Sequence, residues 1–149
     1  MCGIIGISSN KSVSANIINS LKKLEYRGYD SAGVATLFDG QLNEVKSEGR
    51  VDNLEQNFDL KSLKGNIGIG HVRWATHGIP NSINAHPHSS DNVSVVHNGI
   101  IENSTILKKH LINKGHAFKS QTDTEVIVHL ITENLKTMEL EEAITKTLK

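Results

Sequence analysis

The chain has 149 residues, and its 16 basic and 16 acidic side chains cancel at neutral pH. This is the length of one domain, and the balanced charge provides no general field that would attract nucleic acid or an anionic membrane. The single cysteine excludes an intrachain disulfide, no leader-like segment opens the chain, and no apolar run approaches membrane-spanning length. We therefore expect a cytoplasmic protein without a nucleic-acid or membrane partner, and its ligands must be inferred from a site.

The only cysteine stands directly behind the initiator methionine. Removal of Met1 would leave Cys2 with a free α-amine beside its thiol. An N-terminal residue can use its own α-amine as general base, and such amines and thiols titrate near roughly 8 and 8.5, so proton transfer between them is almost thermoneutral. Cys2 is therefore a candidate N-terminal nucleophile. The alternative is a small buried hydrophobic side chain at the start of a strand.

The first thirty residues predict a strand followed by a helix. Residues 2–8 form an apolar run with two glycines, which favours a buried strand close to another backbone. A helical spacing of apolar residues follows, with Ser12 or Ser14 as its N-terminal cap and Gly28 as a left-handed stop.

The next segment predicts a β-hairpin and a short helix. Two strand-like runs, 32–38 and 41–48, are separated by Asp39-Gly40, the signal of a type I′ turn. Antiparallel pairing follows from that turn. Residues 52–60 are polar with a few apolar positions on one side, which predicts a short surface helix.

A second glycine-rich strand is predicted over residues 65–74. Residues 75–92 contain both prolines and no periodicity, and a polar loop of that length in a compact domain is usually functional. Residues 93–96 then form a short apolar strand that ends at a His-Asn-Gly turn.

Two helices follow the turn. A polar side chain at 103–104 can cap the first, and Gly115 can end it. Thr122 and Glu125 fit a capping box for the second, which places Asp123 in its first turn.

A last helix is predicted over residues 140–148, without a signal that would end it. About five strands with helices between them, but without strict alternation, predict an α+β fold with antiparallel pairing that is incomplete at the C-terminus.

Six sequence blocks, in order, resemble the class II glutamine amidotransferases. They are CGIIGI from residue 2, LEYRGYDSAGVA from 24, GHVRWATHG from 70, NAHPH from 84, VVHNGIIEN from 95 and TDTEV from 122. They are most similar to the glutaminase domain of the glutamine–fructose-6-phosphate aminotransferases. Phosphoribosylpyrophosphate amidotransferases share the Cys-Gly start and the His-Asn-Gly turn but lack YRGYDSAG. The resemblance implies an N-terminal nucleophile hydrolase fold, a four-layer sandwich in which helices flank two antiparallel sheets.

The resemblance also implies residue roles. Cys2 would attack the side-chain amide of glutamine and form a thioester. Asn98 and the backbone N–H of Gly99 would stabilise the oxyanion. Arg73 would bind the α-carboxylate of glutamine and Asp123 its α-ammonium group. The remaining implied site residues are Trp74, Thr76, His77 and His86 in the pocket, and Arg27 in support of the nucleophile.

Each signal has a simpler interpretation when it is taken alone. Arg73 could be a surface strand residue, Asp123 a helix N-terminal acid, and Asn98-Gly99 a tight turn. Their joint occurrence in order favours the site. Five histidines within residues 71–97 suggest a metal site as an alternative. Their spacing lacks the defined ligand pairs of such a site, so we expect no metal and no cofactor.

Such glutaminase domains run to roughly 220–240 residues, so residues 1–149 are expected to form only part of one. The sugar isomerase domains that use the ammonia would be absent, and fructose 6-phosphate would be a substrate only through them. The resemblance implies a homodimer for the full-length form. The alternatives are a truncated non-catalytic remnant, or a glutaminase subunit that serves another acceptor.

Overall fold

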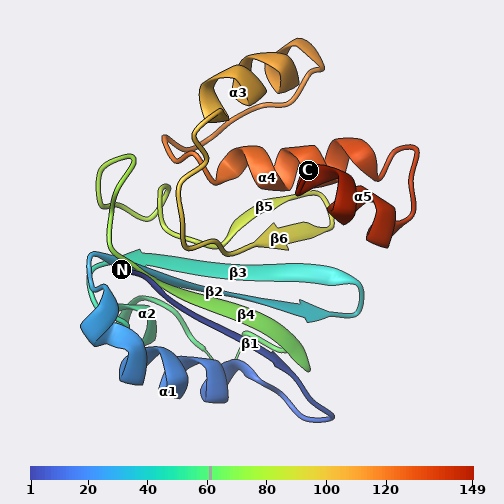
Figure 1. Cartoon of the computed structure of the whole chain (residues 1–149). Helices are drawn as coiled ribbons and strands as arrows, with labels where there is room; N and C mark the ends of the chain where they lie inside the picture. Colours follow the sequence, from blue (N-terminus) through green and yellow to red (C-terminus); the bar gives the residue numbers. More distant parts are fainter. Residues whose placement is uncertain (61) are drawn as a thin grey trace.

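The computed structural model describes residues 1–60 and 62–149, which stack in four layers (Figure 1). The large sheet consists of β1 (Gly3–Ser8), β2 (Ser31–Phe38), β3 (Gln41–Glu48) and β4 (Ile67–Arg73). The helices are α1 (Ser14–Leu24), α2 (Asp52–Asn57), α3 (Ser104–Asn113), α4 (Glu125–Asn134) and α5 (Leu140–Thr147). Helix α1 covers one face of the sheet, while a hairpin of β5 (His88–Ser90) and β6 (Val93–Val95) lies over the other and is covered by α4.

The strand order of the large sheet is β1-β4-β2-β3, and every pairing is antiparallel. Gly3 pairs with Val72, so Cys2 lies beside the end of β4. The expected strands are confirmed, but β1 is an edge strand rather than a buried one, and Ile4 is 42% exposed. The reason is that only β4 pairs with β1, whereas β4 itself lies between two strands.

Side chains alternate along β4 between two different environments. Val72 faces α1 and packs in the apolar core with Ile17, Leu21 and Leu54. The intervening residues His71 and Arg73 point to the opposite face, where they are also buried. Since successive strand residues face opposite sides, one strand supplies both the core and the polar layer between the two sheets.

The predicted β2–β3 hairpin is confirmed. Asp39 and Gly40 have φ values of 50° and 73°, as the two central residues of a type I′ turn require. The predicted loop over 75–92 is partly wrong, because its last residues form β5 and pair with β6. Three residues give too short an alternation for the pattern to be recognised in the sequence.

Three predicted helix signals are wrong. Helix α1 has Val13 at its N-cap without a side-chain hydrogen bond, so neither serine caps it. Gly28 is extended, with φ −179°, and is not a left-handed stop. Glycine is needed here because the backbone of Arg73 passes close to it: a Cβ on residue 28 would lie 2.6 Å from the carbonyl carbon of Arg73. Helix α4 begins at Glu125, so the capping box with Thr122 does not form.

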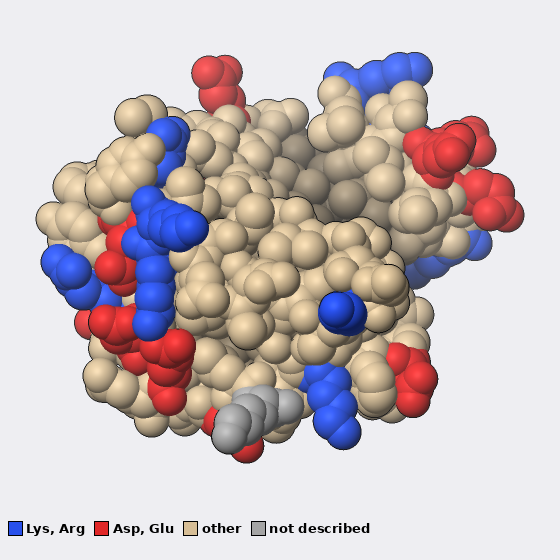
Figure 2. All heavy atoms as spheres, turned by 90° about the horizontal axis from the view of Figure 1, so that it is seen from below, with Lys and Arg blue, Asp and Glu red and all other residues tan. Residues whose placement is uncertain are grey.

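The visible surface carries charges of both signs close together. Figure 2 views the molecule from the side of α1, where acidic and basic side chains mix over apolar and neutral residues. Lys22 of α1, for example, contacts Asp52 at 2.9 Å and Glu55 at 2.5 Å. Among the described residues, no helix is long and apolar enough to cross a membrane, and no group of three or more potential metal ligands is present.

Candidate active site

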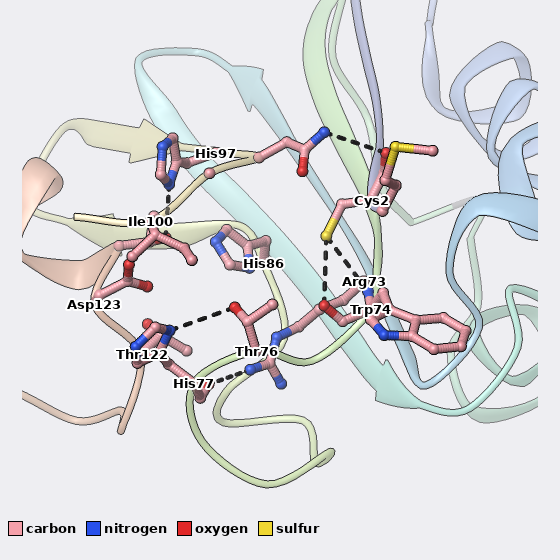
Figure 3. Close-up of a pocket in the computed structure, with 14 residues that line it drawn as sticks. Cys2, Arg73, Trp74, Thr76, His77, His86, His97, Ile100, Thr122 and Asp123 are labelled. Carbon is pink, nitrogen blue, oxygen red and sulfur yellow. Dashed lines mark hydrogen bonds between the residues drawn. The ribbon is translucent and has the colours of Figure 1, made fainter. Parts of the chain in front are cut away.

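A cavity of about 260 Å³ opens where the ends of β1 and β4 meet the turn after β6 and the segment before α4 (Figure 3). Its lining residues are Met1, Cys2, Arg73, Trp74, Thr76, His77, His86, His97, Asn98, Gly99, Ile100, Thr122, Asp123 and Thr124. These residues come from five separate stretches of sequence. The pairing of β1 with β4, and of β5 with β6, brings them together.

The thiol of Cys2 lies at one side of this pocket. Its Sγ accepts a hydrogen bond from the backbone N–H of Trp74 at 3.4 Å (Figure 3). The carbonyl of Cys2 accepts from Arg27 Nε at 3.1 Å and from Asn98 Nδ2 at 3.5 Å. Three donors from distant parts of the chain thus hold the residue at both its side chain and its carbonyl. Because the carbonyl carbon and the side chain are two substituents of the tetrahedral Cα, holding both also fixes the direction of the bond to the Cys2 nitrogen.

The loop after β4 is held by a buried guanidinium. Arg73 is 3% exposed and donates hydrogen bonds to the backbone carbonyls of His77, Gly78 and Ile79. These bonds close the loop over one wall of the pocket. Asp30 anchors the start of the same loop by accepting from the backbone N–H of Ala75.

The charge of Arg73 is balanced by acidic groups on several sides. Burial lowers the pKa of its guanidinium, while Asp30, Cys2 and Asp123 act in the opposite direction. An arginine remains protonated through the physiological range, so this side chain carries a positive charge into the pocket. A positive group opposite a carboxylate fits an amphoteric ligand such as an amino acid.

The opposite wall carries Asp123, which is 7% exposed. The residue precedes α4 rather than lying in its first turn, and its Oδ2 accepts from the backbone N–H of Ile101 at 2.7 Å. Nearby, His97 Nδ1 and Thr124 Oγ1 are 3.1 Å apart, which connects the turn after β6 to the start of α4. The hydrogen bond from Ile101 thus holds the Asp123 carboxylate, and the contact between His97 and Thr124 holds the backbone beside it.

Three histidine rings lie between the two sheets beneath the pocket; His86 stacks on His71 and meets His88 edge to face. The ring centroids of His71 and His86 are 4.3 Å apart, and those of His86 and His88 are 4.6 Å apart. Burial lowers the pKa of His71 and of His88 to about 4, and it lowers that of His86 further. All three rings are therefore neutral at neutral pH. His86 lines the pocket and has no hydrogen-bond partner at either ring nitrogen among the described residues.

The structure brings the sequence-predicted residues together. Every one of them lines the cavity except Arg27, which contacts the Cys2 carbonyl from outside it. Two site residues were not predicted from the sequence: Asp30, which lies within the LEYRGYDSAGVA block, and His97, which lies within VVHNGIIEN. Thr122 and Thr124 were also missed as pocket residues, because they were interpreted as parts of a helix start.

Comparison with known proteins shows the family of this chain. A family model described as "Glutamine amidotransferase domain" matches residues 58–141. A "Glutamine--fructose-6-phosphate aminotransferase [isomerizing]" of Mesorhizobium japonicum is 54% identical over 150 residues, covering 100% of this chain and 25% of the relative. The protein of that name from Pyrococcus horikoshii is 56% identical over 138 residues, covering 91% of this chain and 23% of the relative.

Solved structures support the same fold. A glutamine phosphoribosylpyrophosphate amidotransferase from B. subtilis, complexed with ADP and GMP, superposes with a TM-score of 0.83 and 32% sequence identity. The match covers 99% of this chain and 32% of that one. The expected α+β sandwich is therefore confirmed. The chain spans about a quarter of the length of the curated relatives it matches.

Proposed function

This chain belongs to the glutamine amidotransferase domain family, and we propose that it hydrolyses the side-chain amide of glutamine with the thiol of Cys2 as nucleophile. One observation carries this proposal. The nucleophile candidate, a cation, a carboxylate and an amide donor line the same cavity, although they are up to 121 residues apart in sequence, from Cys2 to Asp123. Glutamine offers a complementary group to each of them.

The reaction requires removal of Met1. The freed α-amine of Cys2 then takes the thiol proton, and the thiolate attacks the amide carbon of glutamine. The α-ammonium returns that proton to the amide nitrogen, so ammonia leaves as the γ-glutamyl thioester forms, and water then hydrolyses the thioester to glutamate and the free thiol. The bonds from Arg27 and Asn98 to the Cys2 carbonyl and from Trp74 to its Sγ support this role, because together they orient both the amine and the thiol.

The other groups bind the substrate and its transition state. Asn98 Nδ2 and the backbone N–H of Gly99 supply the oxyanion donors, and loss of one such donor costs on the order of 3 kcal/mol of activation free energy. Arg73 binds the α-carboxylate, and Asp123 binds the α-ammonium group. Trp74, Thr76, His77 and His86 complete the lining.

The acceptor of the ammonia lies beyond this chain. We propose that residues 1–149 form part of a glutaminase domain whose longer form aminates fructose 6-phosphate, as the names of its relatives indicate. A sugar-isomerase part, and the homodimer that the resemblance implies, belong to that longer form. A thiol nucleophile also requires a reducing compartment, which favours the cytoplasm.

Intact-mass spectrometry after treatment with a glutamine-mimicking diazoketone tests the proposal. We expect one label on molecules that have lost Met1 and none on molecules that retain it, because the retained residue acylates the base. Both forms are resolved in the same spectrum, so the unprocessed form is an internal control. Excess glutamine should block the label.

A Cys2→Ala variant is the matched control and should take no label and release no ammonia from glutamine. If the variant is labelled, or if the unprocessed form turns over glutamine, the assignment of an N-terminal nucleophile is wrong. A folded, processed chain that takes no label would instead support the non-catalytic alternative.

A further inference from the structure

A closed loop of residues 119–125 carries the cavity wall on which Asp123 lies (Figure 3). Glu125 closes the base of this loop. Its Oε1 accepts from the backbone N–H of Lys119 at 2.8 Å, and its Oε2 accepts from that of Ser120 at 2.7 Å. The side chain at the end of the loop thus holds the backbone at its beginning, and the segment between them is fixed at both ends.

The carboxylate of Glu125 is buried and ionised. Glu125 is 5% exposed and is not among the residues that line the glutamine cavity. Burial alone would raise its pKa, but the contact with His129 and the hydrogen bonds from Lys119 and Ser120 outweigh burial and lower the pKa to about 2. An ionised carboxylate can only accept hydrogen bonds, so it determines the direction of every hydrogen bond that it makes.

The hydroxyl of Ser120 extends this direction to the next side chain. Ser120 Oγ lies 2.6 Å from Glu125 Oε2 and must donate its only hydrogen there. It accepts from the backbone N–H of Thr122 at 3.2 Å, and Thr122 Oγ1 lies 2.9 Å away. A hydroxyl has one hydrogen and two lone pairs, so Thr122 Oγ1 must be the donor in its contact with Ser120.

The chain of hydrogen bonds ends at His88, and it determines the tautomer of that ring. Thr122 Oγ1 lies 2.8 Å from His88 Nε2, and its own hydrogen is committed to Ser120. His88 must therefore donate from Nε2. Burial lowers the pKa of His88 to about 4, so at neutral pH the ring is neutral and carries no hydrogen at Nδ1. The opposite direction would leave two hydroxyl oxygens 2.9 Å apart without a hydrogen between them.

Two sides of the glutamine cavity depend on this chain of hydrogen bonds. Thr122 lines the cavity and is followed directly by Asp123. On the other side, the ring of His88 meets that of His86 edge to face at 4.6 Å, and His86 also lines the cavity. The chain therefore connects a carboxylate outside the cavity with both the wall and the floor of the cavity.

We propose that Glu125 and Ser120 are positioning residues for glutamine binding. They hold Asp123 in place for the α-ammonium group, because Glu125 closes the base of the 119–125 loop and Ser120 links Glu125 to Thr122 and His88. Neither Glu125 nor Ser120 lines the cavity, so they act through the wall and not on the substrate itself. The role toward glutamine rests on the proposed function, whereas the direction of the hydrogen bonds does not.

Nitrogen-15 and carbon-13 NMR of the His88 ring in the whole chain tests the direction of the hydrogen bonds. We expect a neutral ring at pH 7 with its hydrogen at Nε2 and a bare Nδ1. The loss of these signals in His88→Gln identifies them. If the hydrogen of His88 is found at Nδ1, or if the ring interconverts between both tautomers, the assigned direction is overturned.

Ser120→Ala interrupts the chain but keeps both backbone hydrogen bonds to Glu125. The hydrogen of Thr122 Oγ1 then loses its acceptor and can turn toward His88 Nε2, so a fraction of the His88 rings should carry their hydrogen at Nδ1. Ser14→Ala makes the same change at a buried serine of α1, on the far side of the large sheet, and should leave the tautomer unchanged. An unchanged tautomer in folded Ser120→Ala would show that Ser120 does not set the direction.

The role toward glutamine is tested by the rates at which two diazoketones alkylate Cys2. One is the glutamine-mimicking amino acid, and the other is the same compound without its α-amino group. We expect Ser120→Ala to slow the first reagent roughly fivefold, the effect of about one hydrogen bond, and to leave the second unchanged, because only the first offers an ammonium group to Asp123. Equal slowing of both reagents would indicate general damage to the site and would refute the positioning role, as would slowing of neither.

Glu125→Gln is a second variant that nearly preserves the size of the side chain. An amide has only one oxygen, so in either orientation its NH2 group opposes the backbone N–H of Lys119 or of Ser120. The base of the loop should open, and we expect the same selective slowing of the amino-acid reagent. The exposed Glu141→Gln is the matched control and should react as the unmodified chain does. A folded Glu125→Gln that reacts normally with both reagents would contradict the proposal.

Failure of the proposed function would give a different result. If neither reagent labels Cys2 in the processed, unmodified chain, the glutamine site is wrong, and the role of Glu125 and Ser120 toward glutamine is wrong with it. The tautomer of His88 would still decide the direction of the hydrogen bonds. If the unmodified chain is labelled but the variants show no selective slowing, the proposed function stands and only the positioning role is lost.

Discussion

Replacement of Gly33 by alanine should damage the site without touching any group proposed to react. Gly33 lies on β2 opposite His71 of β4, beneath the loop that carries His86. A Cβ at this position would lie 2.2 Å from the carbonyl oxygen of His86 and 2.8 Å from Lys46 Cγ. The lysine side chain can move aside, but the carbonyl belongs to the backbone of the loop.

The size of the effect follows from these distances. A carbon and a carbonyl oxygen need about 3.3 Å, so the loop must retreat by about 1 Å. Overpacking of this kind costs about 1–3 kcal/mol of unfolding free energy. A displacement of about 1 Å in a catalytic arrangement can reduce the rate about 100-fold. A 100-fold fall in rate corresponds to about 2.7 kcal/mol, so the loss of transition-state stabilisation should be about as large as the loss of unfolding free energy.

Gly6→Ala is the matched control. Gly6 also lies on a strand of the large sheet, but a Cβ there would be 3.9 Å from its nearest neighbour, Ile69 Cγ2, which is an ordinary contact. Urea unfolding gives the stability of both variants, and glutamine-protected alkylation of Cys2 gives the state of the site. The prediction is wrong if Cys2 of Gly33→Ala is alkylated, and is protected by glutamine, as in the unmodified chain. The close approach of the loop to β2 would then not be needed for the site.

Three other changes follow from the buried groups. Burial lowers the pKa of His71 and His88 from 6.5 to about 4, so the folded state binds fewer protons than the unfolded state between these values. The unfolding free energy is therefore unaffected by these groups above the unfolded-state pKa and decreases as the pH falls toward the folded-state pKa. The decrease should be about 2 kcal/mol per histidine at about pH 5, and urea unfolding at two pH values would measure it. Arg73→Met should release the carbonyls of the loop and abolish glutamine protection while the chain remains folded by circular dichroism; retained protection would show that the loop holds without its guanidinium. Leu54→Ala should lower the unfolding free energy by about 2–5 kcal/mol, because the side chain is fully buried against α1, and a loss below 1 kcal/mol on urea unfolding would contradict the assigned core.

Local patterns were reliable where one short segment determines the structure. The hairpin at Asp39-Gly40 required only two residues that tolerate positive φ, and α1 required only a helical spacing of apolar residues. Signals that depend on a partner failed. Gly28 was expected to end a helix, but its reason lies in the backbone of Arg73, which is 45 residues away in sequence.

The same contrast holds for Glu125. The sequence places it three residues after Thr122, which is the spacing of a capping box. In the folded chain it accepts instead from Lys119 and Ser120, and α4 begins two residues later than expected. The sequence could not predict these donors, because every residue except proline has a backbone N–H that can donate to a carboxylate.

The sequence by itself determined which chemistry is available: one thiol behind the initiator methionine, and ordered blocks that supply a cation, a carboxylate and an amide donor. The residue types can be read directly from the sequence. Only the tertiary structure decided that they share a cavity, because the pairing of β1 with β4 and the position of the β5–β6 hairpin are long-range contacts. The contact between Thr122 Oγ1 and His88 Nε2 is also a product of packing, since no spacing rule relates two residues that are 34 positions apart.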